Sequence, residues 1–186
     1  MPDAPDAAFD VAARRARFES IAPTILEPVR RFLLRRTDAA TAEDALADTL
    51  LVCWRRLDEV PEDAVLPWAY AVARHCLANA KRGQRRQRRT AARLAVVDPP
   101  TEVPEAPGER DDALHEALTA LRAEDGELLR LSAWEQLTPA EIAAVLDLTP
   151  NAVSIRLHRA RQKLREELRK IEAAAGHEES KEGRNR

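Results

Sequence analysis

Apolar residues recur every three or four positions in several stretches of the chain, which is the spacing of one buried helix face. Residues 18–33 have this spacing, but Pro23 and Pro28 each lack a backbone donor, so we predict two short helices there. A cleaner apolar stripe predicts a helix from about residue 42 to residue 57, with Thr41 as its cap. These segments predict the start of an N-terminal helical bundle.

Three further helices follow the same periodicity. One is predicted to begin near Pro67 and to run towards a basic cluster, with Gly83 as a position where it ends or bends. The other two are predicted near residues 112–121 and 127–136. Each half of the chain is therefore small but long enough for a bundle of three or four helices.

The strongest local signal lies in the C-terminal part. Thr138-Pro139-Ala140-Glu141 has the order of a helix cap, a proline at the first helical position and a glutamate that closes a capping box. A four-residue turn, 146–149, follows a helix of about two turns, and Thr149-Pro150 begins the next helix in the same way. Two capped helices joined by so short a turn are typical of a helix-turn-helix.

The second helix of this pair has two distinct faces. Its apolar residues are spaced four, three and four apart, which predicts one buried stripe: Val153, Leu157, Ala160 and Leu164. The opposite face has side chains that can bond base edges or touch a thymine methyl group, namely Asn151, Ser154, Ile155, His158 and Gln162. Cations flank this face and can reach phosphates on both sides of a major groove: Arg156, Arg159, Arg161 and Lys163.

A stretch rich in proline and acidic residues separates the two halves. Four prolines and a glycine fall within residues 99–108, and no apolar periodicity runs through them, as expected of a linker. We predict an all-α fold with two small helical domains at 1–95 and 112–172, a linker at 96–111 and a disordered tail at 173–186. With 45% apolar residues, 33% charged residues and five glycines, the composition favours helices over a β-sandwich.

No motif predicts catalysis, a cofactor or a metal site. Cys53 and Cys76 are 23 residues apart without a CxxC pair or a histidine cluster, so we expect both to be buried apolar residues. The longest uncharged apolar stretch, 64–73, has ten residues, about half of the ~20 that a membrane span needs. The N-terminus has no signal-peptide features, so we expect no membrane insertion and a cytoplasmic location.

The net charge of −2 hides a sorted distribution of charge. Residues 81–93 contain seven basic residues and no acidic one, whereas 98–116 contain seven acidic residues and one arginine, and 156–170 are basic again. Two basic surfaces separated by an acidic connector indicate a protein that binds a polyanion at two places.

Four stretches together resemble the extracytoplasmic-function (ECF) sigma factors, which are specificity subunits of bacterial RNA polymerase. They are residues 42–50 (AEDALADTL) with 54–56 (WRR), 68–74 (WAYAVAR), 137–143 (LTPAEIA) and 153–161 (VSIRLHRAR). They occur in the family's order over nearly the whole chain, with the acidic linker between the second and the third. The resemblance implies a protein without enzymatic activity that directs core polymerase to promoters, recognises −10 and −35 elements and aids promoter melting.

The resemblance also implies a role for each segment. The helix with Asp44, Asp48 and Leu51 would dock on the clamp helices of the polymerase β′ subunit, and the β flap is a further expected contact. Segment 58–66 would hold the −10 strand and an extruded base together with Arg74, His75, Asn79, Lys81, Arg82, Arg85 and Arg86. The −35 element would be bound by Asn151, Ser154, Ile155, Arg156, His158 and Arg159. An anti-sigma factor is another candidate partner.

Two other interpretations start from the same residues. A transcriptional regulator would use the helix-turn-helix as its only DNA module and the N-terminal bundle for sensing or dimerisation, but this leaves the basic cluster at 81–93 without a function. An adaptor that binds only partner helices would leave the cations around residues 151–162 unexplained.

Overall fold

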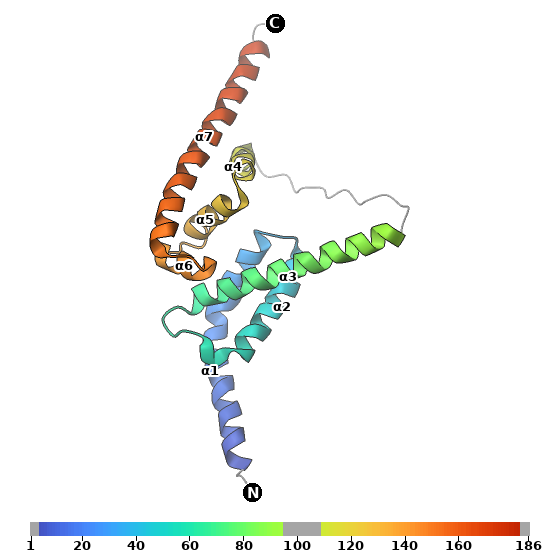
Figure 1. Cartoon of the computed structure of the whole chain (residues 1–186), viewed down its shortest axis with the longest axis vertical. Coiled ribbons are helices and arrows are strands. Elements are labelled where there is room, and N and C mark those ends of the chain that lie inside the picture. Colours follow the sequence, from blue (N-terminus) through green and yellow to red (C-terminus); the bar gives the residue numbers. More distant parts are fainter. Residues whose placement is uncertain (1–3, 95–108, 183–186) are drawn as a thin grey trace. The chain divides into compact units, whose positions relative to one another are not determined.

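The computed structural model describes residues 4–94 and 109–182, and every regular element in these two ranges is a helix (Figure 1). The all-α prediction is confirmed. Contacts divide the chain into two units: α1 to α3 belong to the first, and α4, α5, α7 and the start of α6 to the second. Residues 96–108 of the predicted linker (96–111) lie outside the described residues.

The first helix, α1 (Ala4–Leu34), is continuous, so the prediction of two short helices between residues 18 and 33 is wrong. Pro23 and Pro28 lie inside it, and each removes only one backbone hydrogen bond. Packing outweighs that loss because the inward face is almost completely buried before and after Pro28. Its buried residues are Ile25, Val29, Phe32 and Leu33.

The second helix, α2 (Ala39–Arg55), is capped by Asp38 and not by Thr41 as the sequence predicted. The Asp38 carboxylate accepts bonds from the Thr41 backbone N–H at 2.9 Å and the Thr41 hydroxyl at 2.8 Å. These bonds lower the pKa of Asp38. The Thr41 hydroxyl is buried and also accepts a bond from the Gln84 amide at 2.6 Å, so its role is to join α2 to a later helix.

A short 3-10 helix, η1 (Leu57–Glu59), leads to α3 (Val65–Leu94), which packs against both α1 and α2. The ring centroids of Phe32 and Tyr70 lie 5.0 Å apart in this core. Gly83 does not end α3, because the helix continues for eleven residues beyond it. Cys53 and Cys76 are buried as expected, and burial, with Cys76 nearby, raises the pKa of the Cys53 thiol to about 11.

The C-terminal half contains α4 (Glu109–Ala120), α5 (Ala123–Ala133), α6 (Pro139–Leu146), of which residues 139–143 belong to the second unit, and α7 (Pro150–Glu182). Both α4 and α5 pack against α7. The capping box forms as predicted: the Thr138 N–H and hydroxyl donate to the Glu141 carboxylate at 2.7 Å each. The turn after α6 has Asp147 at a φ of 54°, in the left-handed region that commonly ends a helix. The helix-turn-helix is therefore present.

The last helix is longer than expected. Disorder was predicted for 173–186, but α7 continues to Glu182, and residues 183–186 lie outside the described residues. Three consecutive alanines at 173–175 favour a helix there. Within the described ranges, no helix is long and apolar enough to cross a membrane, and no group of three or more histidine, cysteine or acidic residues could hold a metal ion.

Candidate polymerase and nucleic-acid interfaces

The outward face of α2 carries the three residues predicted to contact the polymerase. Asp44, Asp48 and Leu51 are all exposed, and their spacing of four and three places them on one side of the helix. The buried stripe of α2, which includes Ala45, lies on the other side, so changing these three residues leaves the core intact. Leu51 exposes 44% of its surface, so its apolar side chain is accessible to a partner.

The outward face of α3 forms a long polar ridge. Six of the seven predicted −10 residues are exposed on this helix: Arg74, His75, Asn79, Arg82, Arg85 and Arg86. The Arg82 guanidinium donates a hydrogen bond to the Asn79 side-chain oxygen, which ties two of these residues together. The ridge therefore combines cations that can bind phosphates with an amide and an imidazole that can bond bases.

Lys81 does not share this ridge. Its ammonium donates to the Arg36 carbonyl oxygen at 2.8 Å and is partly buried. That carbonyl lies just beyond the end of α1, where backbone oxygens lack partners within the helix. Lys81 thus anchors α3 to α1 instead of facing the surface that its sequence position suggested.

Segment 58–66, the other part of the predicted −10 site, is held by side chains from α1. Arg14 contacts Asp58 at 2.5 Å, and Arg17 donates to the Val60 carbonyl oxygen at 3.1 Å. Neither arginine was predicted as a site residue, because both precede the apolar stripe that begins at Phe18. The available signal was their spacing of three residues, which places both on one face of a helix.

The predicted reading face of α7 is exposed along its first three turns. Every residue predicted to contact the −35 element is exposed: Asn151, Ser154, Ile155, Arg156, His158 and Arg159. The Thr149 hydroxyl accepts from the Ala152 N–H at 3.2 Å and so caps this helix, and the Ser154 hydroxyl donates to the Pro150 carbonyl oxygen at 3.0 Å. The buried stripe that predicted this orientation is confirmed at Val153, Leu157 and Ala160.

Two of the four flanking cations are bonded within the protein. Arg161 donates to the Ser132 hydroxyl at 3.1 Å, and the Lys163 ammonium lies 2.6 Å from the Asp125 carboxylate. Both contacts join α7 to α5 and support packing of the unit. Arg156 and Arg159 are accordingly the flanking cations best placed for phosphates.

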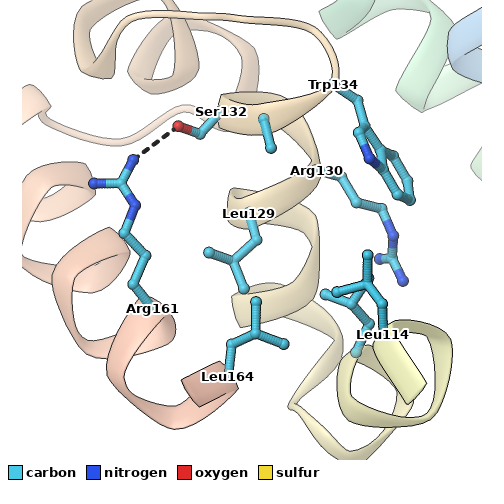
Figure 2. Close-up of a pocket in the computed structure, with 9 residues that line it drawn as sticks. Leu114, Leu129, Arg130, Ser132, Trp134, Arg161 and Leu164 are labelled. Carbon is cyan, nitrogen blue, oxygen red and sulfur yellow. Dashed lines mark hydrogen bonds between the residues drawn. The ribbon is translucent and has the colours of Figure 1, made fainter. Parts of the chain in front are cut away.

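A mostly apolar pocket of about 340 Å³ opens between α4, α5 and α7. Figure 2 shows Leu114, Leu129 and Leu164 pointing into it, with the Arg161–Ser132 bond at one side. At the other side, Arg130 lies 5.9 Å from the centroid of the Trp134 ring, which is 38% exposed. An apolar pocket of this size with an exposed indole at its rim is suited to receiving an apolar side chain.

Comparisons with known proteins identify the family. Residues 111–164 match the family model described as sigma-70, region 4. The chain is similar to the ECF RNA polymerase sigma factor SigL of Mycobacterium tuberculosis, with 30% identity over 171 residues, which cover 89% of this chain and 94% of SigL. The chain belongs to the ECF sigma factor family. RNA polymerase sigma factor CarQ of Myxococcus xanthus is 33% identical over 162 residues, or 83% of this chain and 91% of CarQ.

This sigma factor also shares its fold with a solved structure, the sigma factor RpoE in complex with the anti-sigma factor NepR from Bartonella quintana. The TM-score is 0.61 at 20% identity, over 82% of this chain and 96% of RpoE. Family membership confirms the first of the three interpretations of the sequence: the chain acts in transcription initiation, as a DNA-binding partner of RNA polymerase.

Proposed function

We propose that this sigma factor docks on core polymerase through α2 and binds two promoter elements, one with each unit, without catalysing a reaction itself. The observation that carries the proposal is the reading face of α7. Its polar and apolar side chains are exposed at the start of a capped helix, and Arg156 and Arg159 flank them. This is the arrangement by which a helix-turn-helix reads bases while its cations hold the backbone.

For the −35 element, we assign base contacts to Asn151, Ser154, Ile155 and His158, and phosphate contacts to Arg156 and Arg159. A binding assay of the polymerase holoenzyme on promoter fragments tests this division. Base substitutions in the −35 element should weaken binding of the wild-type holoenzyme, at about 1–3 kcal/mol for each mismatched pair. If the Asn151→Ala variant loses this sensitivity at one base position, that base is the one that Asn151 contacts. Equal sensitivity at every position in both proteins would refute the assignment.

For the −10 element, we assign the unpaired strand to segment 58–66 and the ridge of α3. Apolar walls and cations can receive a base that leaves the stack, at a cost of a few kcal/mol. The phosphate contacts are Arg82, Arg85 and Arg86, while Arg74, His75 and Asn79 lie nearer the start of the helix. Lys81 is omitted from this set because its ammonium is bonded to the Arg36 carbonyl.

For polymerase docking, we assign Asp44, Asp48 and Leu51 to the β′ clamp helices. Asp48→Lys should weaken binding to core polymerase without unfolding α2, because exposed substitutions rarely change stability by more than ~0.5 kcal/mol. Glu172→Lys, which makes the same charge change on an exposed position of α7, is the matched control. A pull-down in which Asp48→Lys retains as much core polymerase as Glu172→Lys would remove this site from the proposal.

The pocket between α4, α5 and α7 is the proposed contact for the polymerase β flap. An apolar flap residue would fill the space lined by Leu114, Leu129 and Leu164 and would cover Trp134. Trp134→Ala should therefore weaken crosslinking between the flap and the C-terminal unit, whereas Trp134→Phe should retain most of it. Equal crosslinking in both variants would exclude this pocket as the flap site.

Two further parts of the proposal concern regulation and the linker. Because the structural relative RpoE forms a complex with the anti-sigma factor NepR, we propose an anti-sigma partner for this chain too, in the cytoplasm where core polymerase acts. We also propose that the acidic linker avoids DNA and threads the polymerase channel that RNA later enters. Deleting residues 101–108 should then reduce transcription while both units stay folded; unchanged initiation and promoter escape would refute a role for the linker.

A further inference from the structure

Two arginines of α1 hold the beginning of segment 58–66 in place. The Arg14 guanidinium donates to the Asp58 carboxylate at 2.5 Å and to the Trp54 carbonyl oxygen at 3.1 Å. Arg17 donates to the Val60 carbonyl oxygen at 3.1 Å. The three acceptors lie at the end of α2, within η1 and directly after η1, so one helix anchors the whole corner from which the segment leaves.

The packing around these bonds restricts the arginines as well. The Arg14 side chain is only 26% exposed although its partner Asp58 is 72% exposed, so the arginine is the fixed member of the pair. Its guanidinium lies 5.9 Å from the Trp54 ring centroid, and Phe18 meets the same ring edge to face at 5.4 Å. Positions 14, 17 and 18 share one helix face, and this face of α1 is directed at the corner.

The other end of the segment is fixed by α3. The Trp68 N–H donates to the Ala64 carbonyl oxygen at 3.1 Å, which continues the first turn of the helix back to Ala64. Arg56 bonds Glu59 and lies 5.8 Å from the Trp68 ring centroid. With both ends fixed, the backbone between residues 60 and 64 has a defined path, and this path depends on α1 at its beginning.

An arginine suits the first anchor better than a lysine does. The guanidinium has five donors in a rigid planar fork, so one group can bond a carboxylate and a carbonyl at once in a fixed geometry. A lysine ammonium at position 14 could keep the ion pair with Asp58 but would not hold the Trp54 carbonyl in the same planar arrangement. Replacing Arg14 by lysine therefore distinguishes a need for the planar guanidinium from a need for positive charge alone.

We propose that Arg14 and Arg17 are positioning residues for −10 recognition, which act through Asp58 and the Val60 carbonyl and do not contact DNA themselves. The proposal rests on the proposed function of segment 58–66. If segment 58–66 is already fixed before DNA binds, binding does not have to include the entropy cost of ordering it. The fixed backbone also determines which base the site accepts. Losing an anchor should thus reduce discrimination between −10 bases, beyond any loss of overall affinity.

The test compares polymerase holoenzymes that contain the full-length wild-type chain, Arg14→Ala, Arg14→Lys, Arg17→Ala or Arg15→Ala. Arg15 is the matched control, since it is exposed and bonded only to Glu19 on its own helix among the contacts described for it. Each holoenzyme transcribes one wild-type promoter and a panel of single-base variants across the −10 and −35 elements. Thermal melting and pull-down with core polymerase report on folding and docking.

We expect Arg14→Ala and Arg17→Ala to lose about tenfold in discrimination at one or more −10 positions, which is the size of a typical base-pair mismatch. Discrimination at −35 and core binding should stay within about twofold of wild type, as should every readout for Arg15→Ala. Compared with Arg14→Ala, Arg14→Lys should restore more of the transcription from the wild-type promoter than of the discrimination between −10 bases.

Two outcomes would overturn the proposal. If the alanine variants lower transcription by the same factor on every −10 sequence, in step with a lower melting temperature, the arginines only stabilise the fold. If the alanine variants keep full −10 discrimination, the arginines are not positioning residues, and a lower slope of DNA binding against salt would then show that they bind phosphates directly. A wild-type holoenzyme without any −10 discrimination would instead refute the proposed function of segment 58–66, and this inference with it.

Discussion

The two long basic helices, α3 and α7, both pack into the core along their first three turns, but their proposed nucleic-acid residues lie at different places along them. In α3, the first three turns are in the core, through Ala69, Tyr70 and Ala73, and exposed cations become dense towards the C-terminal end. In α7, the exposed reading face occupies the first three turns, and the cations that follow, Arg161 and Lys163, are bonded to α5. The helix face on which a cation lies, and not its position along the helix, thus decides whether it bonds within the fold or faces outward.

This difference shows that a count of basic residues does not locate a nucleic-acid surface. Lys81 and Lys163 both lie within basic clusters, yet each is bonded inside its own unit, to a carbonyl oxygen and to a carboxylate respectively. Other cations of the same helices, such as Arg82 and Arg159, have the same charge but are exposed.

The first prediction tests whether α7 folds independently of α3. Leu157→Ala removes a side chain that is 3% exposed, so we expect a loss of about 2–5 kcal/mol from the C-terminal unit. Hydrogen exchange should show lost protection in α5 to α7 and unchanged protection in α1 to α3. The control Leu51→Ala changes an exposed leucine and should alter stability by less than ~0.5 kcal/mol. Equal loss of protection in both units would contradict their independence.

The second prediction concerns sequence preference at the exposed start of α7. His158→Ala should re-rank a panel of −35 variants by about 1–3 kcal/mol at one or two base positions. The imidazole is exposed at the middle of the reading face and can donate to or accept from a base edge. Fluorescence anisotropy with the holoenzyme measures the ranking. If all sequences weakened by one common factor, His158 would be a backbone contact and the face would be wrongly assigned.

The third prediction concerns the cap that orients the helix-turn-helix. Thr138→Ala removes a bond at each end of the capping box and should cost about 0.5–2 kcal/mol. The bonds from Thr138 lower the pKa of Glu141, so the folded state binds a proton less tightly than the unfolded state. This stabilisation is present above the usual glutamate pKa of about 4.3 and is lost as the pH falls through the lowered value.

Thermal melting against pH checks the cap. The melting temperature of the wild type should fall more steeply below about pH 4.3 than that of Glu141→Gln, which cannot titrate. Parallel curves for the two proteins would show that the Glu141 charge adds nothing to the cap.

The fourth and smallest effect separates the two kinds of cation in α7. Arg159→Ala should weaken binding to all −35 sequences similarly and reduce the slope of log affinity against log salt by about one unit, because one counterion fewer is released. Lys163→Ala should leave that slope unchanged and lower stability, since its ammonium is bonded to Asp125. Equal slopes for the two variants would remove the distinction between packing cations and phosphate-binding cations.

Features encoded by neighbouring residues were predictable from the sequence. The capping box of Thr138 and Glu141, the buried stripe with Val153 and the exposure of Leu51 all depend on spacing within a few residues. The continuity of α1 through Pro23 was not predictable in this way, because packing of distant residues on its inward face outweighs a local preference.

Contacts between distant parts of the chain were also missed. The bond from Lys81 to the Arg36 carbonyl joins residues 45 apart, and the bond from Arg14 to Asp58 joins residues 44 apart. Neither pairing has a signature in the local sequence, so α3 could be predicted as basic without showing which cations face outward. The roles of individual site residues therefore remain predictions that the experiments above address.

Run-off transcription is the most direct test of sigma-factor activity in this chain. Core polymerase is incubated with DNA fragments from the genome that encodes this protein. The wild-type chain, the Asp48→Lys variant or no sigma factor is then added. We predict discrete transcripts that appear only with the wild-type chain and are strongly reduced with Asp48→Lys. Identical transcripts with and without the wild-type chain would contradict its function as a sigma factor.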